Sequence, residues 1–226
     1  MILWSIDPLQ ISKISVATTC GKYYYKFSTY LHSLNLSFDS ILPEEISKYS
    51  GNFILTTREE FPKKCVIPIL YEDILEYPPT VLRGLMIQKL NLYFEEAYLI
   101  LGIDPGQRIG LSIFYYGKEI ENSYYSSIQK LVFHIIEILS GLKAKRKIVK
   151  IGNGNMKIAK QIVRILNQNF CSSFEIEFVD ERKTSLKIKN FNQRGKRDML
   201  SAKYISQRTG NRHSILPLSI IGWSNH

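Results

Sequence analysis

One stretch, residues 99–114, constrains the fold more than any other part of the chain. It reads Leu-Ile-Leu-Gly-Ile-Asp-Pro-Gly-Gln-Arg-Ile-Gly-Leu-Ser-Ile-Phe. Short apolar runs that are rich in β-branched residues and bounded by Pro and Gly predict buried strands, so we expect two strands joined by a turn. Asp104 then ends a central strand, where a charge is costly unless a partner compensates it. A divalent cation is the expected partner if other carboxylates arrive from elsewhere in the chain.

The composition is that of an ordinary globular protein. Of the 226 residues, 45% are apolar and 22% are charged, which suits one large domain or two small ones. No apolar run approaches the ~20 residues of a membrane span, and residues 1–15 lack a signal-peptide pattern, so no membrane partner is expected. The three cysteines form no CxxC pair, which argues against a zinc site and favours a reducing, cytoplasmic location.

The basic residues are concentrated in the second half of the chain. Residues 1–97 contain 9 Lys and Arg against 11 Asp and Glu, a net charge of −2. Residues 98–226 contain 21 against 9, a net charge of +12. Such a basic domain favours a polyanionic partner, nucleic acid above all. The alternative is a basic surface that serves only solubility.

Residues 1–97 are expected to form a small α/β domain. Strand patterns occupy 13–19, 37–41, 52–56 and 65–70, and apolar residues at helical spacing occupy 22–36 and 81–93. The Lys-Tyr-Tyr-Tyr run at 22–25 could offer a stacking platform for bases, but such tyrosines more often form the core and edge of a helix. No role for this domain is indicated. Its acidic residues are expected on a solvated face: Glu44, Glu45, Glu59, Glu60, Glu95 and Glu96.

Residues 98–226 show a longer and more regular pattern. After the strand that ends at Asp104, strands are expected at 110–116, 119–126, 148–151 and 174–179. Helices are expected at 127–142, at 156–169 and around 197–205. The predicted order is therefore β-β-β-α-β-α-β-α, and the tail after residue 210 is left unassigned.

Acidic residues stand at the ends of three of these elements. Asp104 ends the first strand, Asp180 and Glu181 follow the fifth strand, and Asp198 opens the last helix. Functional groups of an open α/β sheet gather at the carboxyl ends of its strands. Carboxylates that converge there repel one another, and they suit Mg²⁺ or Mn²⁺. Two such ions can activate a water and stabilise the leaving oxygen of a phosphodiester.

Basic residues surround these carboxylates in the sequence. Their density suits the positioning of phosphates, which carries no sequence information; the alternative is a solvated loop. The candidates for nucleic-acid binding are Arg108, Arg182, Lys183, Lys187, Lys189, Arg194, Lys196 and Arg197.

Each acidic residue also has a simpler explanation when it is taken alone. Asp104 could shape the turn before Pro-Gly. Asp180 and Glu181 could merely end a strand, and Asp198 could be a first-turn helix carboxylate that the helix dipole stabilises. His134 lies in an apolar helix, where a packed histidine is more common than a metal ligand.

Three motifs resemble the ribonuclease H-like superfamily, over about residues 98–210. They are Gly-Ile-Asp-Pro-Gly at 102–106, Val-Asp-Glu-Arg-Lys-Thr-Ser at 179–185 and Arg-Asp-Met-Leu-Ser-Ala at 197–202. Within the superfamily they are most similar to the RuvC/YqgF group of resolvases and pre-ribosomal RNA nucleases. The resemblance implies a mixed five-stranded sheet flanked by helices over 98–226. It also implies that Asp104, Glu181 and Asp198 are catalytic, metal-binding carboxylates, with Asp180 as a substitute for Glu181.

One departure from the family pattern bears on the substrate. RuvC proteins carry a glutamate at the end of the fourth strand, where this chain has Gly-Asn-Gly-Asn at 152–155. This difference favours a YqgF-like site and argues against junction resolution. A resolvase would also be expected to act as a homodimer.

The resulting hypothesis is a metal-dependent endonuclease that hydrolyses structured nucleic acid, either branched DNA or an RNA precursor. The alternative is a nucleic-acid-binding scaffold on the same fold that does not cut. A sugar-kinase or actin-like ATPase is the weakest option, because residues 1–97 lack a second glycine motif of the kind that fold requires.

Overall fold

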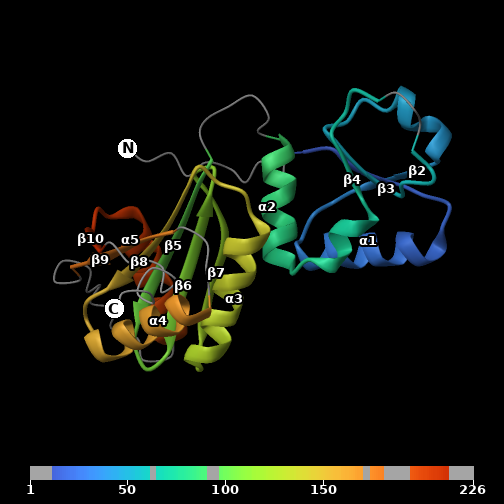
Figure 1. Ribbon diagram of the computed structural model, residues 1–226. Coiled ribbons are helices and arrows are strands. Elements are labelled where there is room, and N and C mark those ends of the chain that lie inside the picture. Colours follow the sequence, from blue (N-terminus) through green and yellow to red (C-terminus); the bar gives the residue numbers. More distant parts are fainter. Residues whose placement is uncertain (1–11, 62–64, 91–96, 170–173, 181–193, 214–226) are drawn as a thin grey trace, which may run out of the picture. The chain divides into compact units, whose positions relative to one another are not determined.

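The computed structural model describes residues 12–61, 65–90, 97–169, 174–180 and 194–213, without the side chains of 194–196, 212 and 213 (Figure 1). The chain divides into two compact units, Met1–Glu95 and Glu96–His226. This division lies two residues from the boundary that the sequence suggested. Among the described residues, no helix has both the length and the apolar character needed to cross a membrane.

The first unit is a small α/β domain built on a parallel sheet. Its strands are β1 (Ile14–Ala17), β2 (Asp39–Ile41), β3 (Phe53–Thr56) and β4 (Ile69–Tyr71), in the order β2-β1-β3-β4. Helix α1 (Gly21–Ser33) connects β1 to β2 and the 3₁₀ helix η1 (Pro43–Lys48) connects β2 to β3, while the 3₁₀ helix η2 (Glu72–Glu76) and helix α2 (Pro79–Leu90) follow β4. The expected strands and helices are therefore all present. β4 begins later than expected because Pro68 has no N–H to donate to a ladder.

Apolar side chains from α1 and the central strands form the core of this unit. Phe27 and Leu31 of α1 are buried, and so are all four residues of β1 and of β3. Tyr25 is 70% exposed, so the tyrosines at the start of α1 lie on the edge of the helix rather than in the core. Asn35 adopts a left-handed φ of 53° just after α1, a backbone conformation that is common where a helix ends.

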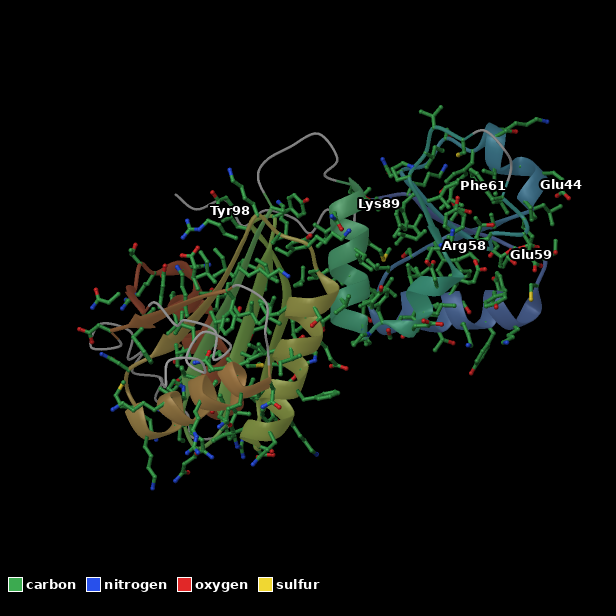
Figure 2. All side chains as sticks on the ribbon, viewed as in Figure 1. Glu44, Arg58, Glu59, Phe61, Lys89 and Tyr98 are labelled. Carbon is green, nitrogen blue, oxygen red and sulfur yellow. The ribbon has the colours of Figure 1, made fainter. Side chains whose placement is uncertain are left out.

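Glu60 corrects the expectation of a uniformly solvated acidic face. Glu44 and Glu59 are exposed, as expected (Figure 2). The Glu60 carboxylate instead accepts hydrogen bonds from the Thr18 and Thr19 hydroxyls, from the Thr19 N–H at 2.7 Å and from the Thr57 hydroxyl at 2.8 Å. Burial alone would raise its pKa, but these bonds outweigh burial and lower the pKa to about 2. Glu60 is thus an internal tie between the ends of β1 and β3.

The second unit is a mixed sheet with helices packed against it. Its strands are β5 (Tyr98–Pro105), β6 (Ile109–Tyr115), β7 (Lys118–Tyr125), β8 (Arg146–Gly152), β9 (Glu175–Val179) and β10 (Asn211–His213). The order across the sheet is β10-β9-β8-β5-β6-β7. β6 runs antiparallel to β5 and β7, whereas β8 and β9 run parallel to β5. The five expected strands are present, and β10 adds a sixth strand from the tail left unassigned.

Helices α3 (Ile128–Gly141), α4 (Met156–Asn169) and α5 (Arg194–Gln207) complete this unit (Figure 1). α3 and α4 pack against each other and against the sheet, while α5 lies on β5 and β6. Leu101, Ile103 and Leu111 are fully buried and alternate along their strands with the residues that meet α5. The sheet is therefore covered on both faces, and α5 occupies the face that carries Asp104.

Candidate active site

Two glycines allow α5 to lie directly on the sheet. A Cβ atom at Gly102 of β5 would collide with the carbonyl oxygen of Ala202, and one at Gly110 of β6 would collide with that of Asp198. Only glycine permits so close an approach of two backbones. The contact at Gly110 places the Asp198 backbone immediately above β6.

Asp104 lies beside that contact. In the antiparallel β5–β6 ladder, Asp104 is the direct partner of Gly110. Directly opposite residues project from the same face of a sheet, and their Cα atoms lie about 4.5–5.5 Å apart. Asp104 therefore shares the α5 face with Gly110, and both Asp104 and Asp198 are half-buried. The structure thus brings two acidic residues that are far apart in the sequence to neighbouring positions, since Asp104 pairs with Gly110 and the Asp198 backbone lies over Gly110.

The position of Asp198 in its helix differs from the simpler explanation of it. α5 begins at Arg194, so Asp198 lies in the second turn rather than the first. The helix dipole acts mainly within the first turn. Burial raises the pKa of the Asp198 carboxyl, and the charges of Arg197 and Arg108 oppose that rise. The environment of Asp198 is therefore determined by its packing on β6 and not by a capping role at the helix N-terminus.

The ends of three neighbouring parallel strands meet at this edge of the sheet. Ile103 of β5 is the partner of Ile151 in β8, and Gly152 of β8 is the partner of Val179 in β9. Asp104 and Asp180 each follow directly in the chain. Asp180 is exposed, and its backbone carbonyl accepts a hydrogen bond from Arg208 at 3.3 Å.

Two ion pairs fasten α5 and the segment after it to the sheet. Lys203 of α5 lies 2.6 Å from Glu119 at the start of β7. Lys150 of β8 lies 3.7 Å from Glu177 of β9, and its ammonium group also donates to the carbonyl of Arg208. Lys150 and Glu177 are only 8% and 6% exposed. Burial lowers the pKa of Lys150, and the nearby Glu177 charge counteracts this effect.

These anchors were not identified from the sequence, although a signal for them exists. Lys150 interrupts the apolar run at 148–151, and Glu177 lies inside the strand pattern at 174–179. A charge within a buried strand requires a partner. The pattern does not say which partner, because the pairing depends on the strand order.

Arg197 and Arg108 are exposed, and their charges act on the Asp198 carboxyl. Glu181, Arg182, Lys183, Lys187 and Lys189 lie outside the described residues, and of Arg194 and Lys196 only the helical backbone is described. Within the described ranges, no group of three or more His, Cys, Asp or Glu side chains is arranged to hold a metal. The described part of the site therefore consists of Asp104 and Asp198, with Arg108 and Arg197 next to Asp198.

His134 lies away from this site and is packed, as expected. Its Nε2 atom is 2.7 Å from Glu121 of β7, and its Nδ1 atom is 3.5 Å from Glu137 of α3. Burial would lower the pKa of this imidazole, but the two carboxylates outweigh burial and raise it. The histidine thus serves to join α3 to β7.

Comparison of the chain with protein-family models and with curated proteins finds no significant match.

Proposed function

We propose that the second unit is a divalent-metal-dependent endonuclease of the RuvC/YqgF type, which hydrolyses phosphodiester bonds of structured nucleic acid. The observation that carries the proposal is that Asp198 of α5 lies over Gly110, the direct partner of Asp104 at the end of β5. The strand order supports it, because a central strand flanked by an antiparallel hairpin and by two parallel strands is the arrangement expected of a ribonuclease H-like fold.

The chemistry of the donor set fits Mg²⁺ or Mn²⁺. Asp104 and Asp198 supply only carboxylate oxygens, which such hard cations prefer. We assign Glu181 as the third ligand in preference to Asp180. Glu177 is the partner of Lys150, which is the partner of Gly102, so Glu177 and Val179 project from the α5 face; because successive strand residues alternate between faces, Asp180 is expected to project from the other face. When bound, two such ions supply an activated water and stabilise the leaving oxygen.

The basic residues are proposed to hold the substrate backbone. Arg108 lies in the turn between β5 and β6, and its charge opposes the rise in the pKa of Asp198. A phosphate bound to Arg108 would therefore lie next to the carboxylates. Arg182, Lys183, Lys187, Lys189, Arg194, Lys196 and Arg197 extend this positive surface in the proposal. Phosphate contacts of this kind position a substrate without reading its sequence.

The test is cleavage of labelled four-way junctions, flap DNA, single strands and structured RNA, with Mg²⁺ or Mn²⁺ and with chelator. We expect metal-dependent cutting that falls more than about 100-fold in Asp104→Asn and Asp198→Asn, since even outer-shell partners of metal ligands cost 10–100-fold when mutated. Asp39→Asn makes the same change at an exposed residue of the first unit and should cut normally.

Two outcomes would count against the proposal. Tight, salt-sensitive binding without cutting by any of these proteins would favour the non-cutting scaffold instead. Cutting that survives both Asp104→Asn and Asp198→Asn would assign catalysis to other residues.

A further inference from the structure

An exposed tyrosine stands in the same row of the sheet as the candidate carboxylates. In the β6–β7 ladder, Tyr124 is the direct partner of Gly110, which is itself the partner of Asp104. The three residues therefore form one row across three adjacent strands and project from the α5 face. Two strand spacings, about 10 Å, separate the backbones of Tyr124 and Asp104.

Tyr124 is open to solvent and next to a basic residue. β7 is the edge strand on this side of the sheet, and the Tyr124 residue is 52% exposed. The Arg108 guanidinium carbon lies 5.7 Å from the centre of its ring. The charge of Arg108 also opposes the rise in the pKa of Asp198, so the same guanidinium lies near both the exposed ring and the proposed site.

The neighbouring residue, Tyr125, has a structural role in the same strand and serves as a comparison. Tyr125 projects from the opposite face, where its hydroxyl lies 3.4 Å from Glu121 and its ring centre lies 5.7 Å from that of His134. Tyr125 thus packs against α3, whereas Tyr124 presents its ring on the α5 face, next to Arg108. Packing against α3 explains the position of Tyr125, but it does not explain why the Tyr124 side chain is exposed.

We infer that Tyr124 stacks on an unpaired base of the substrate next to the bond that is cut, while Arg108 contacts the adjoining phosphate. An aromatic ring accepts any base as a stacking partner, but only a base that has left its duplex can reach it. This inference rests on the proposed nuclease function and narrows its substrate: the preferred nucleic acid carries an unpaired nucleotide at the cleavage site, as flaps, loops and open junctions do.

The experiment measures binding in the absence of cutting. Asp104→Asn protein is titrated with two oligonucleotides that differ only at one position. In the first, that position is an unpaired 2-aminopurine; in the second, it is paired, so that the duplex is complete. Adding Tyr124→Ala should weaken binding of the unpaired oligonucleotide about 10-fold, the size expected for one lost base–aromatic stack, and leave the duplex unchanged. Tyr124→Phe and Tyr124→Trp should retain the tight binding and the quenching of 2-aminopurine fluorescence.

Two controls separate stacking from a general loss of structure. Phe133→Ala removes another exposed aromatic side chain of the same unit, on α3, and should bind both oligonucleotides as before. Replacing the unpaired base by an abasic site should weaken binding by the Asp104→Asn protein, and adding Tyr124→Ala should then have no further effect. Thermal unfolding should be nearly the same for all these proteins.

Equal weakening of both oligonucleotides by Tyr124→Ala, or no weakening, would overturn the stacking inference. The nuclease proposal would still stand if the wild-type protein cuts and Asp104→Asn does not. Failure of the wild-type protein to bind or cut any nucleic acid would overturn both.

Discussion

The two units place carboxylates at equivalent positions and use them differently. In the first unit, Glu60 lies at the carboxyl ends of β1 and β3, where hydrogen bonds from three threonines lower its pKa to about 2. In the second unit, Asp104 lies at the carboxyl end of β5 and Asp198 of α5 packs over its partner Gly110, where burial raises the pKa of Asp198. A strand end is therefore not in itself a functional site. What distinguishes the two cases is the direction of the pKa shift, because hydrogen bonds lower the pKa of Glu60 whereas burial raises that of Asp198.

The largest expected effect concerns the anchor that holds the segment after α5 to the sheet. Lys150→Met leaves Glu177 buried without its charged partner, which should cost about 3–5 kcal/mol of the free energy of unfolding, measured in urea. The first unit offers a matched control: Arg58→Met removes an exposed partner of Asp73, a surface pair worth about 0–1 kcal/mol.

A double substitution tests whether the loss of stability comes from the buried charge of Glu177. Lys150→Met with Glu177→Leu removes both charges and should recover most of the lost stability, because the desolvation penalty disappears with the pair. Equal effects of Lys150→Met and Arg58→Met would show that burial does not distinguish the two pairs.

The next effect concerns the contact that sets Asp198 beside Asp104. Gly110→Ala puts a methyl group against the Asp198 carbonyl, so α5 must shift; we expect a loss of about 1–3 kcal/mol, together with loss of cleavage. Gly21→Ala introduces the same methyl group in the first unit, where no atom lies within 4 Å. Urea unfolding and the cleavage assay should therefore report no loss for Gly21→Ala. Normal cleavage by Gly110→Ala would contradict the proposed role of this contact.

The smallest effect tests the carboxylate that is structural. The pKa of Glu60 is lower in the folded chain than in the unfolded one, so its stabilisation is present above about pH 4.5 and is lost as the pH falls towards 2. Because the carboxylate is partly open to solvent, we expect about 1 kcal/mol. Glu60→Gln should reduce this part of the acid dependence of unfolding and leave cleavage unchanged. A loss of cleavage in Glu60→Gln would remove the distinction between the two units.

Most elements could be predicted from the sequence because they depend on residues that are neighbours in the chain. Apolar alternation predicted the strands, and helical spacing predicted the helices. β8 is longer than the apolar run predicted, since it begins at Arg146 rather than Ile148. The reason is long-range: Arg146 pairs with Glu175 on the adjacent strand, at 2.7 Å, so a polar residue is stabilised inside the sheet.

By itself, the sequence determined the order of the strands and helices along the chain and nominated Asp104 and Asp198 as site residues. Only the tertiary structure decided that these two residues share a face, that Glu60 is an internal tie, and that Tyr124 stands in the row of Asp104. The physical reason is that a side-chain pattern reports the face of one element, whereas the partner across a sheet depends on strand order and register. Here the glycines at 102 and 110 convert that register into the close contact with α5.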